Sequence, residues 1–454
     1  MGVRLENAGE TSGYLGGVLQ PHPHQTFMRH WGTYNMQETT FFTQILGISL
    51  PWFISNVELN KAENRVDIYI SHSKGFAFPC PECQRLCSVY DHTKERIFRH
   101  LNVCQMATFI HVRLPRIECP EHGVLQIVSG LGEENSSMTY EFESFVIDLE
   151  QECSIESICR LLDLNWHTFW DVMQKAVERG QSRKPHGIPE RIGVDEKSFS
   201  KGHRYETLVY DIDNATVEYV GDKRNQQSLE TYFKQFTPEE RQKVKSIAMD
   251  MWDPYIAATK SCIPKAEKKI VFDRYHVMRL VVDSVDKVRK QEHRALMEEG
   301  NDILKGTKYL WLCNEENIPP YRWTQFEYLR SLDLKVWRAR AIKDNLRNLW
   351  NYHREGWMRK YFTRWYFWAT HSRMGPIIKA AKSLKSHIDN IVTYAKHRIT
   401  NAMAESINSK IEKVKRLACG YRTREHYKTA IYFHCGVLDL YPRRKSVPFQ
   451  VVNP

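Results

Sequence analysis

The order of strand-like and helical runs after residue 190 restricts the fold more than any other feature of this sequence. Three strand-like runs follow one another, and helices then alternate with two further strand-like runs. The predicted strands are 192–199, 205–212, 216–220, 244–249 and 269–272, and the predicted helices between them are 228–236 and 255–262. Such an order predicts one mixed sheet, with an antiparallel half followed by a parallel half.

This order is typical of the ribonuclease-H-like α/β fold, in which the first and fourth strands are neighbours. Asp195 lies in the first strand and Asp250 follows the fourth, so we expect their carboxylates to lie side by side. Glu405 lies on a predicted helix over 399–416 and supplies a third acid. Three such carboxylates can hold two Mg²⁺ (or Mn²⁺) ions, because these ions prefer oxygen ligands. Two ions about 4 Å apart activate a hydroxyl and stabilise the leaving oxygen of a phosphodiester.

Three neighbouring acids are rivals for these positions: Glu196, Asp253 and Asp273. Alternation along a strand directs Glu196 to the face opposite Asp195, which argues against it. Asp273 follows a short, buried-looking strand and is expected to support the site from behind the ligands.

Two short cysteine motifs of the same form predict a zinc site. They are Cys80-Pro-Glu-Cys83 and Cys119-Pro-Glu-His122. Three thiolates and one imidazole form the closed, four-ligand set of structural Zn²⁺ sites. Other candidates for the fourth ligand lie between the two motifs, namely Cys87, His92, His100 and Cys104.

The segment between the motifs is basic, and Arg96, Arg99 and Arg116 are candidate contacts to a DNA backbone. A solvated surface explains such arginines equally well. Residues 131–180 read as three helices with a short turn before Asn165. This pattern fits a helix-turn-helix, whose reading residues at a major groove are expected to be Asn165, His167 and Thr168.

Residues 295–395 read as an all-helical insertion with many tryptophans and basic residues. Aromatic residues at helical spacing usually form a core, although such side chains can also hold DNA ends. The helix that carries Glu405 continues as a basic stretch and is expected to follow a phosphodiester backbone. The candidate DNA-binding residues there are Lys410, Lys413, Lys415, Arg416 and Arg422.

The net charge of +11 favours a polyanionic partner. No apolar run reaches the roughly 20 residues of a membrane span, and the N-terminus lacks the pattern of a signal peptide. We therefore expect a cytoplasmic protein that binds a polyanion. Residues 1–35 are expected to be a disordered extension, or translation upstream of a start at Met36.

The motifs in this order closely resemble those of insertion-sequence transposases with an Asp-Asp-Glu triad, in the group called the ISL-three family. They are the paired zinc motifs, Ile-Gly-Val-Asp195, Met-Asp250-Met-Trp, Phe-Asp273-Arg-Tyr-His276 and Thr-Asn-Ala-Met-Ala-Glu405. The resemblance covers about residues 36 to 440. An acid at Asp253, just after the second aspartate, departs from the family pattern.

This resemblance implies a multidomain α+β protein, in which N-terminal zinc-ribbon and helix-turn-helix modules precede a ribonuclease-H-like core with a helical insertion. It implies Asp195, Asp250 and Glu405 as the metal-binding triad. The partners implied are the terminal inverted repeats of the element and target DNA, bound by a homodimer on paired ends. The expected divisions are 36–130 (zinc), 131–180 (helix-turn-helix), 181–294 (core), 295–395 (insertion), 396–440 (core with Glu405) and 441–454 (tail).

Two alternatives use the same features. A regulator would bind DNA through the zinc and helix-turn-helix modules without any chemistry, and the three acids argue against it. A nuclease of the same fold would hydrolyse DNA but would not join a 3′-hydroxyl to a target.

Overall fold

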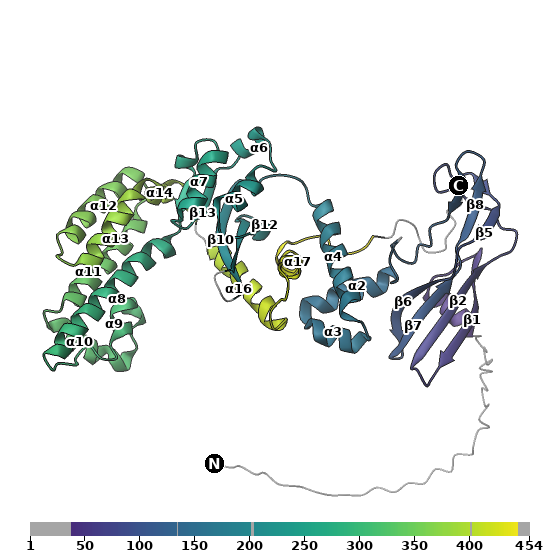
Figure 1. Ribbon diagram of the computed structural model, residues 1–454, viewed down its shortest axis with the longest axis horizontal. Helices are drawn as coiled ribbons and strands as arrows, with labels where there is room; N and C mark the ends of the chain where they lie inside the picture. The colour runs from purple at the N-terminus through teal and green to yellow at the C-terminus, as the bar shows by residue number, and fades with distance from the viewer. Residues whose placement is uncertain (1–37, 134, 201–203, 400–401, 444–454) are drawn as a thin grey trace, which may run out of the picture.

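The computed structural model describes residues 38–133, 135–200, 204–399 and 402–443. These residues form an elongated molecule (Figure 1), with a β-rich N-terminal domain at one end and a helical lobe at the other. A small helical bundle and a mixed sheet lie between them. The expectation for residues 1–35 lies outside the described residues, as does most of the expected tail.

The N-terminal domain is built on a four-stranded sheet of order β1-β2-β7-β6, in which only β2 and β7 run parallel. Its inner face buries Ile54, Ile68 and Ile110, as the alternation of apolar residues predicts. Two smaller sheets, β3-β4 and β5-β8-β9, extend it. The elements are α1 (Glu38–Ile45), β1 (Trp52–Asn60), β2 (Arg65–His72), β3 (Phe78–Pro79), β4 (Leu86–Cys87), β5 (Val89–His92), β6 (Arg96–Val103), β7 (Met106–Val112), β8 (Pro115–Cys119) and β9 (Gly123–Gln126).

Three helices follow as a bundle: α2 (Tyr140–Glu152), α3 (Ile155–Leu162) and α4 (Trp166–Arg183). Each begins after a polar residue whose side chain accepts a hydrogen bond from the first turn, at Thr139, Ser154 and Asn165 respectively. These capping residues therefore determine where the three helices begin. Helix α4 runs four residues past the predicted end at Arg179, through Gly180.

The central sheet has the order β12-β11-β10-β13-β14. β10, β11 and β12 are antiparallel, whereas β13 and β14 run parallel to β10. The predicted adjacency of the first and fourth strands is thus confirmed. The strands are β10 (Arg191–Ser200), β11 (Arg204–Asp211), β12 (Thr216–Asp222), β13 (Ser246–Met249) and β14 (Ile270–Phe272).

Both faces of this sheet are covered. One face buries Ile192, Val194 and Ile247 in a large core shared with helices of the lobe. The other face buries Leu208 and Tyr210 against α16 (Ala402–Leu417) and α17 (Arg424–Cys435). The core on the first face also includes residues of α5 (Gln226–Phe233), α7 (Asp253–Cys262) and the 3₁₀ turn η1 (Ala266–Lys268), whereas α6 (Pro238–Gln242) buries none of its residues.

The helical lobe corresponds to the predicted insertion, but it is continuous with the sheet because α8 (Arg274–Glu298) begins directly after β14 and extends into the lobe. Trp311, Trp350 and Trp365 are buried there, as expected for a core. Trp357 and Trp368 are exposed. The remaining elements are α9 (Lys308–Leu312), η2 (Glu315–Asn317), η3 (Pro320–Arg322), α10 (Trp323–Ser331), α11 (Lys335–Leu346), η4 (Arg347–Asn351), α12 (Glu355–Thr370), α13 (Gly375–Ser386), α14 (Ile388–Val392) and α15 (Tyr394–His397).

After α17 the chain returns to the bundle as a short strap, residues 436–443. Leu440 is buried in the bundle core, and the Tyr441 hydroxyl donates a 2.6 Å hydrogen bond to Asp148. Leu438 lies so close to Gly180 that a Cβ there would meet the Leu438 Cβ at 2.6 Å. Tyr441 was expected to begin the tail, yet it belongs to this packed strap.

Candidate active site and metal centre

The central sheet brings the two predicted aspartates together. β10 and β13 run parallel, with Gly193 paired to Ala248. Two residues further along, the same register reaches Asp195 and Asp250. The Asp195 charge is close enough to raise the pKa of Asp250. Asp253, the acid that departs from the family pattern, begins α7 and is exposed.

Asp195 is held from two sides. Its Oδ1 accepts a 2.8 Å hydrogen bond from the backbone amide of Glu196, and its Oδ2 accepts one of 2.7 Å from the side-chain amide of Asn408. Asn408 in turn accepts a 3.0 Å hydrogen bond from the hydroxyl of Tyr210. The carboxylate therefore faces α16, and its orientation is fixed by side chains of the sheet and of this helix.

Glu405 lies in the first turn of α16, where its side chain is exposed. It lines a cavity of about 400 Å³ together with Asp273, which follows β14. Burial raises the pKa of Asp273, and the charges of Glu405 and Asp195 raise it further, whereas His276 lowers it. Asp273 is thus a fourth acid at the same strand ends.

Asp250 is almost buried, and burial raises its pKa while Arg224 lowers it. Arg224 Nη2 lies 2.7 Å from Asp250 Oδ2 and 3.2 Å from Glu196 Oε1. Burial and the charge of Asp250 raise the pKa of Glu196 to about 7. Glu196 thus joins Arg224, whereas Asp195 joins Asn408, in agreement with the predicted alternation of the two side chains.

Asp195, Asp250, Asp273 and Glu405 are together called the acid cluster. Its chemistry suits a hard divalent cation. Asp250 Oδ1 is buried without a hydrogen-bond partner among the described residues. An unpaired buried carboxylate oxygen is costly, and a cation satisfies it. The charge of Asp195 raises the pKa of Asp250, and the charge of Glu405 raises that of Asp273, which also signals negative charge in excess. Carboxylate oxygens are the ligands that Mg²⁺ and Mn²⁺ prefer, so these residues fit such an ion.

Sequence reasoning missed Asn408 and Arg224. Asn408 lies three residues after Glu405, a spacing that places both side chains on one helix face, and this signal was available. Arg224 follows β12 and reaches Asp250 only because of the strand order, so no local pattern marks it.

The four predicted zinc ligands converge in the N-terminal domain. The ligand atoms of Cys80, Cys83, Cys119 and His122 all lie within 4.8 Å of one another. Cys83 Sγ lies 3.7 Å from Cys119 Sγ, and Cys119 Sγ lies 3.6 Å from His122 Nδ1. Tetrahedral zinc with Zn–S bonds of ~2.3 Å requires donors about 3.8 Å apart. The donor set therefore fits Zn²⁺.

The local electrostatics also favour a bound metal. A hydrogen bond from the backbone of Glu121, together with one from His122, lowers the pKa of the Cys119 thiol to about 6. The thiolate is the form that binds zinc. Of the rival fourth ligands, Cys104 is exposed, and none is part of the four-residue cluster.

The predicted DNA contacts of the N-terminal domain are engaged within the protein. Arg99 is buried, donates to the carbonyl oxygen of Thr108 at 3.2 Å and lies over the ring of Phe142. This side chain cannot reach a phosphate at the surface, because it ties the sheet to the bundle. Arg96 donates to the Ser136 carbonyl at 3.1 Å. Arg116 forms a two-pronged ion pair with Asp91.

In the bundle, Asn165 caps α4 by accepting from the backbone amide of Thr168 at 2.8 Å and from its hydroxyl at 2.9 Å. Asn165 and His167 are exposed. The ring of Trp170, one turn further, stacks on His426 of α17 with centroids 4.1 Å apart. Trp170 therefore packs this part of α4 against α17, while Asn165 and His167 at the beginning of the helix remain exposed.

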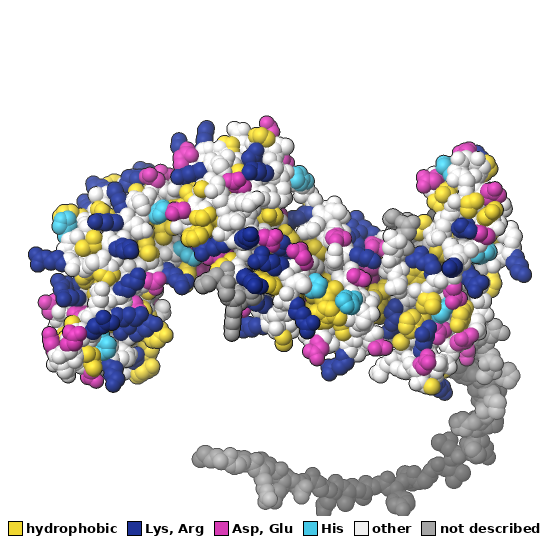
Figure 2. Space-filling model, viewed as in Figure 1, with side chains coloured by type: hydrophobic (Ala, Val, Ile, Leu, Met, Phe, Trp, Pro, Cys, Tyr) yellow, Lys and Arg dark blue, Asp and Glu magenta, His cyan; other side chains and the backbone are white. Residues whose placement is uncertain are grey.

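The basic residues after Glu405 have different environments, because successive residues of a helix point in different directions. Lys410, Lys413 and Arg416 are exposed on α16. Lys415 instead donates a 2.9 Å hydrogen bond to the Ser198 carbonyl, and Arg422 is exposed in the loop before α17. Figure 2 shows Lys and Arg side chains spread over the visible face from the helical lobe to the N-terminal domain.

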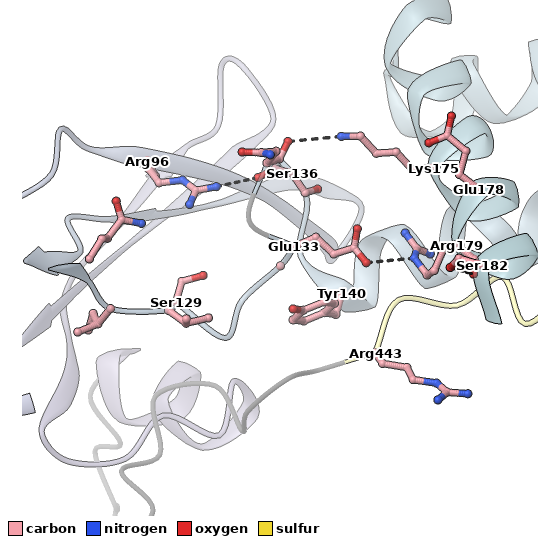
Figure 3. A pocket seen from close by; sticks show the side chains of 15 residues that line it. Arg96, Ser129, Glu133, Ser136, Tyr140, Lys175, Glu178, Arg179, Ser182 and Arg443 are labelled. Atoms are coloured by element: carbon pink, nitrogen blue, oxygen red, sulfur yellow. Dashed lines mark hydrogen bonds and ion pairs between the residues drawn. The ribbon is translucent and has the colours of Figure 1, made fainter. Parts of the chain in front are cut away.

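A cavity of about 580 Å³ separates the N-terminal domain from the bundle (Figure 3). Its cations are bound to protein oxygens: Arg179 pairs with Glu133 at 3.0 Å, and Lys175 donates to the Asn135 carbonyl at 3.4 Å. It is a polar seam between two domains and lies apart from the acid cluster.

Comparison with known proteins extends this picture. Residues 192–431, just over half of the chain, match the family model of ISL3 transposases of the DDE type. Residues 77–122 match the zinc finger found in the transposases of IS204, IS1001, IS1096 and IS1165.

Two relatives align over most of the chain. The transposase of insertion sequence IS1001 from Bordetella parapertussis is 28% identical over 354 residues, which are 77% of this chain and 86% of the relative. The transposase of IS1557 from Mycobacterium tuberculosis is 24% identical over 425 residues, 86% of this chain and 93% of the relative. No helix among the described residues is long and apolar enough to cross a membrane.

Proposed function

The chain belongs to the ISL3 family of insertion-sequence transposases, and from this premise we propose that it cuts DNA at the ends of its element and joins them to a target. The double-stranded terminal inverted repeats are the proposed substrate, and the 3′-hydroxyl released by cleavage is the proposed nucleophile. We assign the central domain to the ribonuclease-H-like fold on its strand order. Joining two ends in one reaction favours a homodimer acting at the bacterial chromosome.

The observation that carries this proposal is the convergence of acids from three segments at one edge of the sheet. Asp195, Asp250 and Glu405 are the proposed holders of two divalent cations, with Asp273 beside them. Two such ions supply Lewis-acid activation of the attacking oxygen and stabilisation of the leaving oxygen. The chain itself orients Asp195 through Asn408 and restrains Asp250 through Arg224.

The other parts of the chain have proposed roles in binding DNA. The zinc-ribbon domain at 36–130 and the helix-turn-helix bundle at 131–180 recognise the element ends, with Asn165, His167 and Thr168 nearest the bases. Arg96, Arg116 and the exposed cations of α16 contact phosphates, and Arg422 lies beyond them. Arg99 is left out of this set because it is buried.

The test is a joining assay with the purified protein, Mg²⁺, a target plasmid and a labelled duplex that carries the terminal repeats of the element. The unmodified protein should give joined products. Asp250→Asn should bind the same duplex with unchanged affinity but give no cleavage. A matched control is Asp253→Asn, which alters an exposed carboxylate three residues away and should keep activity.

Two results would contradict the proposal. Joining by the Asp250→Asn variant would remove the acid cluster from the chemistry. Cleavage without any joining, at a saturating concentration of target DNA, would indicate a nuclease that only hydrolyses DNA.

A further inference from the structure

A third cavity lies beside Arg224, the residue that binds Asp250. It has a volume of about 340 Å³, which is within the range of small-ligand pockets. It is formed by the start of β11, the end of β12, the segment after β13 and the start of α17. Its lining residues are Arg204, Tyr205, Lys223, Arg224, Trp252 and Arg424.

The lining is cationic and aromatic, and among the described residues it includes no carboxylate. Arg224 and Arg424 are partly neutralised, by Asp250 at 2.7 Å and by Asp222 at 3.7 Å. Arg204 and Lys223 are exposed and form no ion pair with another described residue. Net positive charge beside an exposed tryptophan ring favours an anionic ligand that also has a flat surface.

Trp252 presents that flat surface. Its side chain is 37% exposed, and the guanidinium of Arg224 lies 4.2 Å from its ring centroid. Trp252 occupies the N-cap position of α7 and makes no capping hydrogen bond, although Ser, Thr, Asp or Asn is preferred there. Helix capping therefore does not account for an exposed tryptophan at this position.

We propose that this cavity binds one unstacked nucleotide of the DNA strand next to the phosphodiester that is cut. The base stacks on Trp252 and Tyr205, and its phosphate lies among Arg204, Lys223 and Arg424. Aromatic rings together with a cationic groove are the usual means of holding single-stranded nucleotides. The inference rests on the proposed function, because it takes DNA at the acid cluster as its premise.

Arg224 connects the cavity to the acid cluster. One face of its guanidinium is covered by Trp252, while Nη2 bonds to Asp250 Oδ2. A base seated on Trp252 therefore lies one side chain away from a proposed metal ligand. Removing a base from the duplex costs stacking and pairing energy, and the cavity offsets this cost next to the bond that is cut.

The kinetic test compares two substrates in single-turnover cleavage: a fully paired element end, and the same end with the flanking nucleotide left unpaired. Trp252→Ala should slow cleavage of the paired end about 10-fold, the effect of losing one base–aromatic stack. It should slow the unpaired end much less, because that base is already free. Trp252→Phe should restore most of the rate.

Arg204→Ala should slow the paired end as well. Arg191→Ala is the matched control, since Arg191 lies at the opposite end of the strand paired with β11 and binds Asp213, and it should have no effect. Equal slowing of both substrates by Trp252→Ala would assign Trp252 a purely structural role, and an unchanged rate would remove it from DNA binding. Either result overturns the inference while leaving the transposase assignment intact.

A second readout does not depend on cleavage. The element end is prepared with 5-iodouracil at the flanking position, bound to the protein and irradiated, and the crosslinked peptide is identified by mass spectrometry. Crosslinks at Trp252 or Tyr205 are expected. Crosslinks only elsewhere would overturn the inference, even for a preparation that binds DNA without cutting it.

Discussion

The side-chain amide of Asn408 donates a 2.7 Å hydrogen bond to Oδ2 of Asp195, although 213 residues separate the two in the chain. Asn408 lies one helical turn after Glu405, so α16 both carries one acid of the cluster and orients another. The position of Glu405 and the orientation of Asp195 are therefore coupled through a single helix.

Asn408→Ala is expected to reduce cleavage about 10-fold or more, because a hydrogen bond to a charged group contributes ~1.5–3 kcal/mol. Binding of the element end should stay unchanged. The check is single-turnover cleavage over a range of Mg²⁺ concentrations, where a higher Mg²⁺ requirement indicates a mispositioned ligand. Ser409→Ala, which removes only an exposed hydroxyl bonded to the Glu405 carbonyl, is the control and should behave as wild type.

Replacing Cys80 or Cys119 by Ser is expected to abolish zinc binding and unfold the N-terminal domain, because the metal supplies much of the folding free energy of such sites. Metal content by mass spectrometry and circular dichroism would measure both effects. Cys104→Ser should retain zinc, since Cys104 is exposed and outside the cluster. Full zinc content in the Cys119 variant would refute the assigned ligands.

Lys413→Ala combined with Arg416→Ala is expected to weaken binding of every DNA sequence alike. If both contact phosphates, the slope of log affinity against log salt should become shallower by about 2. Fluorescence anisotropy at several salt concentrations gives this slope. Lys61→Ala, an exposed change in the β1–β2 turn, should leave the slope as it is; an equal slope for the double variant would place α16 away from DNA.

Glu206 gives a prediction about pH. Its side chain is fully buried, neither carboxylate oxygen accepts a hydrogen bond from a described residue, and burial raises its pKa from 4.5 to about 7. Between these two values the folded state holds a proton that the unfolded state has lost, so the free energy of unfolding falls as pH rises. Above about pH 7 this contribution levels off.

Glu206→Gln replaces the titrating carboxyl group with an amide that does not titrate. Urea unfolding at pH 5, 6, 7 and 8 should therefore give a smaller loss of stability across this range for the variant than for the wild type. Identical pH profiles would mean that Arg424, 3.4 Å away, keeps Glu206 charged throughout.

The strap gives a prediction about stability. Leu440→Ala is expected to lower the free energy of unfolding of the bundle by ~2–5 kcal/mol, as for other large-to-small changes in a core. Gly180→Ala should act in the same direction, because the new Cβ would meet Leu438. Arg443→Ala lies at the surface and should change stability by no more than about 0.5 kcal/mol. Thermal unfolding of the three variants tests whether the strap is part of the bundle.

The sequence predicted the central sheet because its strands are periodic and separated by clear turns. β10 and β13 were placed within two residues of their observed starts, and the positions of Asp195 and Asp250 followed from strand order. Three zinc ligands were equally predictable from the paired cysteine motifs, whereas the fourth was left open between His122 and four other residues; the cluster contains His122.

Features that depend on tertiary contacts could not be predicted from the sequence. Arg99 is a surface cation by composition, yet burial against Phe142 makes it internal. Arg224 belongs to the site only through the packing of β12 against β11. Residues 436–440 were predicted as part of the core domain and residues from Tyr441 onward as a tail, because nothing in this sequence indicates that Leu440 completes the core of the distant bundle.

The strap also has a consequence for synthesis on the ribosome. The bundle core contains Phe433 and Leu440, which are made long after its own helices. Domains usually fold N-terminal first as they emerge, but this bundle cannot complete its core until the central domain has been synthesised. A chain that ends before Phe433 therefore lacks part of the bundle core, and we expect it to compete poorly for the proposed element ends.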